Sequence, residues 1–140
     1  MKWRPLRTVF NSGKILQRIF TRIMLKKSDM QTGDVILIPF PFSDLNQAKL
    51  RPAVLVCETS DGYKDLVLAA ITSVLHVPLF SNEILLKASD TNGLRVDSIL
   101  RCDRIMTLRS ESAYLKIGRL EDADLFAFKT VFRNLVEIPG

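Results

Sequence analysis

Residues 33–58 most constrain the fold of this chain, because they contain two short apolar runs, at 35–38 and 53–56, joined by a polar connection. Short β-branched runs bounded by glycine and proline predict strands that bury one face. Two such runs so close in sequence predict neighbouring antiparallel strands. We therefore expect the rest of the chain to be arranged around this pair.

Prolines mark both ends of the connection between these two strands. Pro39 and Pro41 are expected to end the first strand, since proline has no amide hydrogen for a ladder and a fixed φ. Pro52 is expected to be tolerated only because it starts the second strand. The connection from 39 to 50 is longer than a plain hairpin needs, which indicates a functional loop. Arg51 then lies at a strand end, between this loop and a rigid proline.

A guanidinium in such a setting suits an anionic ligand. Arginine stays protonated and carries five donors, so Arg51 can stabilise a phosphorane but cannot easily act as a base. The alternative is structural, because a surface or ion-paired arginine at a strand end is common.

The 140 residues predict one domain with a real core, and 47% hydrophobic and 25% charged residues are ordinary for a soluble globular protein. No apolar run approaches the roughly 20 residues of a membrane-spanning helix. The two cysteines, Cys57 and Cys102, have no C-x-x-C or Cys/His spacing, so we expect no zinc site and no other metal. Both are expected to be buried free thiols in a reducing, cytoplasmic setting.

The net charge of +5 belongs to the N-terminal arm, because residues 1–30 contain eight basic residues and one acidic residue. The charge is therefore no evidence that the folded body binds nucleic acid. Apolar residues at helical spacing predict a basic amphipathic extension, which suits a transit peptide or a membrane-surface helix. Alternatively the start is assigned too early, since Met24 and Met30 both precede Gly33. We divide the chain into this extension, 1–30, and a domain at 31–140.

After residue 58 the pattern predicts further strands separated by turns. Residues 73–82 are expected to form a loop or a broken edge strand, and Asn92-Gly93 a turn. The expected strands are 66–72, 83–87, and 96–102 with 105–108, the last two as one long bent strand or two short ones.

The C-terminal segment changes period and predicts a helix. From Glu121 the apolar residues fall on one helical stripe, and carboxylates crowd the first turn, where they suit the helix dipole and the free amides. Pro139 is expected to end this helix. Five or six strands followed by one packing helix predict a mainly β, barrel-like α+β domain.

Several polar residues besides Arg51 are candidates for chemistry. Thr72 and Ser73 end a predicted strand, where they either satisfy turn amides or donate to a phosphate oxygen. Arg101 and Asp103 are two apart and should share a strand face, either as a plain charge pair or as an acid/base pair. On this interpretation Asp103 is the only well-placed carboxylate.

His76 and the loop aromatics are weaker candidates. His76 is expected to be a solvated loop histidine. Phe40 and Phe42 alternate with prolines, so they suit base stacking or, more simply, core or dimer contacts.

Four segments resemble the MazF/PemK toxins of type II toxin–antitoxin systems. GDVILIPFPFSDL followed by KLRPAVLV resembles the opening of that family, and Ala70-Ile71-Thr72-Ser73 resembles its third strand end. Leu100-Arg101-Cys102-Asp103 resembles the RCD segment of the PemK-type branch, and Lys116-Ile117-Gly118-Arg119-Leu120 resembles the C-terminal run. The resemblance covers about residues 30–137.

This resemblance implies an SH3-like small barrel of the plasmid-maintenance toxin type that acts as a homodimer. It implies an mRNA interferase that cleaves single-stranded RNA at short sequences without a cofactor, leaving a cyclic phosphate and a 5′-OH. It also implies a cognate antitoxin that competes with RNA for one groove. The matching positions are catalytic Arg51, Thr72, Arg101 and Asp103, and RNA-binding Phe42, Ser43, Lys49, Ser73 and Arg104.

Two departures from the family pattern limit the mechanism. Arg104 stands where the PemK-type branch often has Gln, and the first loop lacks the histidine sometimes found there. A non-catalytic barrel that poisons a topoisomerase through protein contacts stays open as an alternative, as does a degenerate toxin domain. The joint presence of Arg51, Thr72, Arg101 and Asp103 favours the enzyme.

Overall fold

The computed structural model describes residues 30–40, 49–113 and 115–137. Expectations about residues 1–29, Phe42, Ser43 and Pro139 fall outside these ranges. The described residues form a six-stranded antiparallel sheet with strand order β4-β5-β3-β2-β1-β6 and one α-helix, α3. The strands are β1 (Asp34–Phe40), β2 (Lys49–Glu58), β3 (Leu66–Thr72), β4 (Glu83–Leu86), β5 (Ser98–Leu108) and β6 (Leu115–Arg119).

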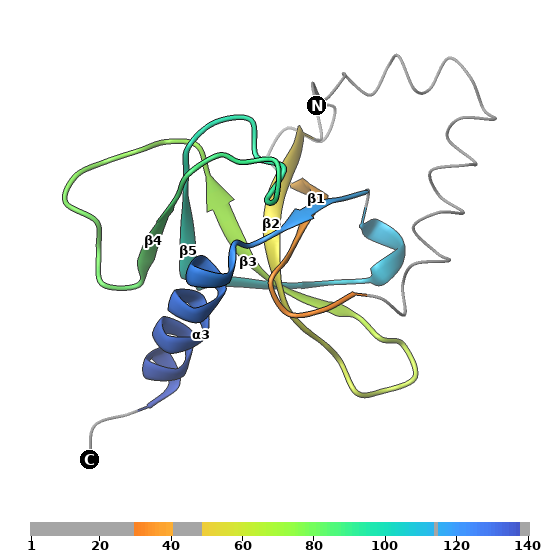
Figure 1. Ribbon diagram of the computed structural model, residues 1–140. Helices are drawn as coiled ribbons and strands as arrows, with labels where there is room; N and C mark the ends of the chain where they lie inside the picture. Colours follow the sequence, from red (N-terminus) through yellow and green to blue (C-terminus); the bar gives the residue numbers. More distant parts are fainter. Residues whose placement is uncertain (1–29, 41–48, 114, 138–140) are drawn as a thin grey trace, which may run out of the picture.

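The sheet curls into a half-barrel, and α3 (Asp122–Val136) packs beside β4 and β5 (Figure 1). A short 3-10 helix, η2 (Ser110–Ser112), precedes β6. The mainly β, α+β fold class with a C-terminal helix is confirmed. No helix among the described residues is long and apolar enough to span a membrane.

Both proline expectations at the first hairpin were wrong in detail. β1 continues through Pro39, which pairs with Leu50, and Pro52 lies inside β2, opposite Leu37. The missing amides are harmless because each proline lacks a strand neighbour on its other side. The β1–β6 pairing ends at Leu37, and the β2–β3 pairing begins only at Ala53.

The sheet buries apolar residues on both faces. Val35, Val54, Ile71, Leu100 and Phe128 belong to a core cluster on the face that α3 covers. A second cluster lies on the other face, where the curl of the sheet encloses it and the Met30 side chain packs against it. Its buried members are Ile36, Ile38, Ala53, Leu55, Leu66, Leu68 and Ala113. Two cores on one sheet explain why the strand residues are apolar on both faces.

A bulge settles the form of β5, for which the sequence left two possibilities. Ala70 pairs with Arg101 while the adjacent Ala69 pairs with Ile105, so residues 102–104 have no partner on β3. One long strand therefore bends here, as bulged strands do. A second register shift, between Leu55 and Cys57, accompanies the exposure of Cys57. The expected burial of this cysteine was wrong, whereas Cys102 is buried as expected.

Gly33 anchors the beginning of β1 to the rest of the domain. Its N–H donates to the Leu55 carbonyl at 2.8 Å, and its carbonyl accepts from the Leu120 N–H at 2.8 Å. Its φ of +97° favours glycine, and a Cβ there would lie 2.7 Å from a Leu125 methyl group. The first described residues are thus fixed against β2 and the start of α3.

The β4–β5 connection is held by its own polar side chains. Asn92 is fully buried, accepts from the Ser89 and Leu94 N–H groups and donates to the Lys87 carbonyl. Gly93, with φ +71°, touches the Ile117 carbonyl of β6. Ser89 also donates to Glu121, which precedes α3 and makes no side-chain cap bond of its own. Hydrogen bonds and close packing therefore hold this loop in one position beside β6.

Candidate functional site

Arg51, Thr72 and Arg101 lie on one face of three neighbouring strands, β2, β3 and β5. β2 and β3 pair up to Ala53 opposite Ala70, and Arg51 and Thr72 lie two residues beyond this pair, at corresponding positions. Because side chains alternate along a strand, residues two apart share a face. Ala70 in turn pairs with Arg101 of β5, so Arg101 is a diagonal neighbour of Thr72 on that face.

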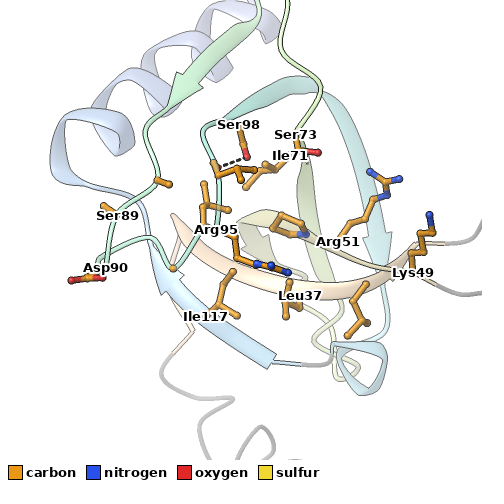
Figure 2. Close-up of a pocket in the computed structure, with 16 residues that line it drawn as sticks. Leu37, Lys49, Arg51, Ile71, Ser73, Ser89, Asp90, Arg95, Ser98 and Ile117 are labelled. Carbon is orange, nitrogen blue, oxygen red and sulfur yellow. Dashed lines mark hydrogen bonds between the residues drawn. The ribbon is translucent and has the colours of Figure 1, made fainter. Parts of the chain in front are cut away.

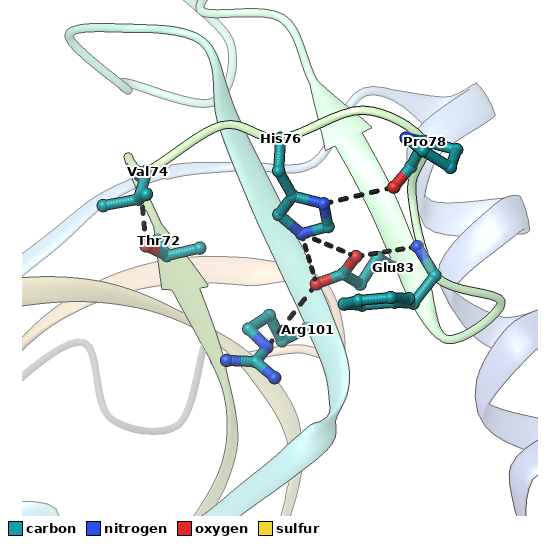
Figure 3. Close-up of polar contacts among 7 residues, drawn as sticks. Thr72, Val74, His76, Pro78, Glu83 and Arg101 are labelled. Atoms are coloured by element: carbon teal, nitrogen blue, oxygen red, sulfur yellow. Dashed lines mark hydrogen bonds and ion pairs between the residues drawn. The ribbon is translucent and has the colours of Figure 1, made fainter.

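The Thr72 hydroxyl has a fixed orientation. Its Oγ1 accepts a hydrogen bond from the Val74 N–H at 3.1 Å (Figure 3). This bond uses an acceptor lone pair and leaves the hydroxyl hydrogen without an acceptor among the described residues. The first interpretation of Thr72 is therefore confirmed, because its hydroxyl satisfies a turn amide, and donation to a phosphate oxygen stays a prediction.

Arg101 pairs with Glu83 of β4, a residue that sequence reasoning missed. The two residues are opposite each other in the β4–β5 register, and Arg101 Nε lies 3.6 Å from Glu83 Oε2. Arg101 Nε is buried, and its distance from the Glu83 carboxylate is too long for a hydrogen bond. No described residue accepts a hydrogen bond from this guanidinium. Arg101 thus has a charge partner while its donors stay available.

Glu83 is almost completely buried and also binds His76. His76 Nε2 lies 3.0 Å from Glu83 Oε1, and His76 Nδ1 lies 3.1 Å from the Pro78 carbonyl oxygen. The Phe80 N–H donates to the same carboxylate at 2.9 Å (Figure 3). Burial raises the pKa of Glu83, but the Phe80 amide, His76 and Arg101 together outweigh it and lower the pKa below its usual value.

Two expectations about this cluster were therefore wrong. His76 is half-buried and bonded through both ring nitrogens, so it is no solvated loop residue. Asp103 is not the only well-placed carboxylate, because the carboxylate paired with Arg101 is Glu83. The sequence signal for Glu83 was a carboxylate opening a short strand, but only the pairing of β4 with β5 shows its partner.

Asp103 and Arg104 are exposed on the bulge of β5. The bulge interrupts the pairing with β3 immediately after Arg101, and no ion pair or hydrogen bond joins Arg101 to Asp103 among the described residues. Asp103 does act on its neighbour, because burial and, second, the Asp103 charge raise the pKa of the Cys102 thiol to about 11. The structure thus brings Arg51, Thr72 and Arg101 together and leaves Asp103 and Arg104 beside them in solvent.

A cavity of about 820 Å³ opens next to Arg51. Its apolar floor includes Leu37, Ile71 and Ile117, and the β4–β5 loop forms another wall (Figure 2). Pro52 also lines the cavity. Among the described residues its charged lining is Lys49, Arg51, Arg95 and Asp90, and its hydroxyl lining is Ser73, Ser89 and Ser98. An apolar floor with a cationic margin suits a flat ring attached to an anionic group.

The described residues contain no group of three or more His, Cys, Asp or Glu side chains arranged for a metal ion. What the site offers is hydrogen-bond donors and fixed positive charge. Such groups stabilise negative charge that develops on phosphate oxygens.

A curled antiparallel sheet with cations and a hydroxyl on one face of neighbouring strands defines a small β domain with a candidate site for an anion. An endoribonuclease in complex with its cognate antitoxin, from a mycobacterial species, shares the fold with a TM-score of 0.60 and 18% identity, covering 79% of this chain and 98% of that chain. MazF from Deinococcus radiodurans is similar with a TM-score of 0.55 and 19% identity, covering 78% of this chain and 97% of that chain.

Mycobacterium tuberculosis toxin MazF-mt6 is also similar, with a TM-score of 0.56 and 17% identity over 76% of this chain and 99% of that chain. Comparison with curated protein sequences finds no match. The family described as PemK-like, MazF-like toxin of type II toxin–antitoxin system matches residues 31–136. The chain therefore belongs to the PemK-like, MazF-like toxin family.

Proposed function

We propose that this protein is a toxin endoribonuclease that cleaves single-stranded RNA without a metal ion. The observation that supports the proposal is that Arg51, Thr72 and Arg101 lie on one face of three neighbouring strands. Family membership and the titles of the similar structures, which name endoribonucleases, support RNA as the substrate.

The reaction needs few protein groups because RNA supplies its own nucleophile. The 2′-oxygen attacks the adjacent phosphorus and loses its proton, the bond from phosphorus to the 5′-oxygen breaks, and the 5′-oxygen gains a proton. The products are a 2′,3′-cyclic phosphate and a 5′-OH. In this scheme Arg51 and Arg101 stabilise the charge on the phosphorane, and the Thr72 hydroxyl donates to one of its oxygens.

The proton transfers are the less constrained part of the scheme. Asp103 remains our proposed acid/base partner because it is exposed close to Arg101 in the chain, although no ion pair or hydrogen bond among the described residues joins it to Arg101. Lys49, Ser73 and Arg104, with Phe42 and Ser43 of the first loop, are proposed to bind the RNA. Unstacked bases over these loops would give sequence selectivity, and the cavity beside Arg51 has room for one of them.

The proposal includes two protein partners. The first is a second copy of this chain, since the family resemblance implies a homodimer. The second is a cognate antitoxin, because one similar structure contains an antitoxin. An acidic segment of that antitoxin would lie over the cationic site and exclude RNA. A cytoplasmic location is part of the proposal, because messenger RNA is found there.

The test is incubation of the purified protein with a long single-stranded RNA in EDTA. Discrete fragments whose 5′ ends accept a phosphate from a kinase without prior phosphatase treatment support the proposal, since they carry 5′-OH. Cyclic phosphate at the other end, detected by mass, completes the assignment. RNA left intact at every metal concentration would contradict it and favour a toxin that acts through protein contacts.

A further inference from the structure

The three side chains His76, Glu83 and Arg101 form a chain of charges behind the site. Glu83 is in the middle, with 3% of its side chain exposed, and it contacts a cation or potential cation on either side. Arg101, with 32% of its side chain exposed, is the member that lies on the face of Thr72, and His76, 37% exposed, is at the other end. A buried carboxylate must keep its partners, so the position of Arg101 depends on what His76 does.

Both ring nitrogens of His76 face oxygen atoms. Nδ1 faces the Pro78 carbonyl at 3.1 Å and Nε2 faces the Glu83 carboxylate at 3.0 and 3.2 Å. A neutral imidazole has one N–H, whereas an imidazolium has two. When His76 is protonated, both contacts are hydrogen bonds and Glu83 shares its negative charge between two cations. When His76 is neutral, Arg101 is the only cation left to balance Glu83.

We propose that Glu83 and His76 are positioning residues for Arg101, and that the charge on His76 sets how much of the Arg101 charge remains for a bound phosphate. The inference deepens the proposed function and rests on it, because the phosphate is that of the RNA substrate. A protonated His76 frees Arg101 for phosphate, so RNA binding through Arg101 is strongest at low pH. When His76 is neutral, the positive charge of Arg101 balances Glu83 and less of it remains for the phosphate.

Few charged groups lie around His76 and Glu83, so a pH-dependent change in Arg101 can be assigned to one residue. Among the described residues, the titratable or charged groups in contact with His76 and Glu83 are each other and Arg101, and the Phe80 ring lies beside His76 with centroids 5.0 Å apart. His76 is also the one histidine in the sequence. A change in Arg101 between about pH 5 and 8 can therefore be assigned to His76.

The first test follows the full-length protein by heteronuclear NMR without RNA. We expect the Arg101 Nε–H resonance to shift with the same midpoint as the resonances of the His76 ring when the pH is varied. The Glu83→Gln variant should abolish this coupling, whereas Glu111→Gln, on the exposed surface of η2, should leave it intact. The inference is overturned if the Arg101 resonance does not shift when His76 changes its protonation state.

The second test measures cleavage and binding. Glu83→Gln should lower kcat at least about tenfold through misplacement of Arg101, with little change in KM. His76→Gln should flatten the dependence of affinity for a 2′-O-methyl RNA on pH between about 5 and 8. His76→Lys, which keeps a positive charge, should retain at about pH 8 the affinity that the wild type has at about pH 6.

The outcomes separate the two proposals. If the wild type leaves RNA intact while Arg101 still follows His76, the proposed function fails and the coupling stands. If RNA is cut but Glu83→Gln and His76→Gln keep the wild-type kcat and pH profile, the inference is overturned and the function stands. Circular dichroism checks that each variant is folded. If Glu83→Gln does not fold, the test depends on the His76→Gln variant.

Discussion

Arg51 is the residue on which the proposed chemistry depends most. It lies at the margin of the cavity and at the strand end beside Thr72, so it can reach a phosphate from a fixed backbone. Removing one preorganised donor of this kind typically costs about 10²–10³ in rate. We expect Arg51→Ala to lose at least that much RNA cleavage, measured as kcat in EDTA.

The matched control is Arg133→Ala, which removes an exposed arginine from the last turn of α3. It should cut RNA at the wild-type rate. Equal rates for Arg51→Ala and the control would remove Arg51 from the mechanism.

The two cysteines should differ sharply in reactivity. Cys102 is buried and the pKa of its thiol is raised to about 11, whereas Cys57 is exposed. Because the thiolate is the reactive form, we expect one thiol per native chain to react rapidly with a disulfide reagent at about pH 8, and both to react after denaturation.

Replacing Cys57 by Ser should abolish the fast phase and leave the slow one. Rapid reaction of both thiols in the native protein would show that the core around Cys102 opens easily.

At this scale the sequence predicted the candidates but not their partners. Arg51 stands out because it follows a long polar loop and directly precedes a proline and an apolar run, and Thr72 stands out because it ends an apolar run. Glu83 and His76 did not stand out, since their importance comes from the pairing of β4 with β5, which places Glu83 opposite Arg101. Strand order is a property of the whole sheet and cannot be inferred from local spacing.

The element with the tightest packing constraint is the β4–β5 loop where it touches β6. A Cβ on Gly93 would collide with the Ile117 carbonyl, and the φ of +71° disfavours any other residue. Left-handed strain and overpacking together should make Gly93→Ala lose about 3 kcal/mol in the free energy of unfolding. Denaturant titration measures this loss.

Gly62 offers the control for the Gly93 variant. Nothing lies within 4 Å of a Cβ built there, so Gly62→Ala should change stability by less than about 1 kcal/mol. Equal stability of the two variants would mean that the loop moves away from β6 at no cost.

Elements with strong local signals were predicted well, and those decided by neighbours were not. β3 has the predicted bounds, Leu66–Thr72, and α3 begins one residue after Glu121. The prediction that prolines mark the strand ends was wrong because a missing amide hydrogen weakens a strand only where a neighbouring strand would accept a hydrogen bond from it. β6 was not assigned as a strand because its five residues, LKIGR, include Gly118, which is needed for contact with Thr91 and Asn92.

The stability of the whole molecule should fall in acid partly because of Glu83. Its pKa is lowered in the folded state, so its stabilising contribution is complete above its usual value of 4.5 and is lost as the pH falls through the folded value. The denaturation midpoint of the wild type should therefore decrease below about pH 4.5, and Glu83→Gln should show a shallower decrease. Identical slopes would show that other carboxylates carry the effect.

Gly33 fixes where the chain enters the domain, and this has a practical consequence for labelling. β1 rises about 3.3 Å per residue, so Gly33 and the Ile38–Arg51 pair are about 17 Å apart along the strand. A fluorescent reporter or affinity handle fused ahead of Met30 would thus be attached at the opposite end of β1 from Arg51. The amino-terminal side is the better attachment point when the site itself must stay accessible.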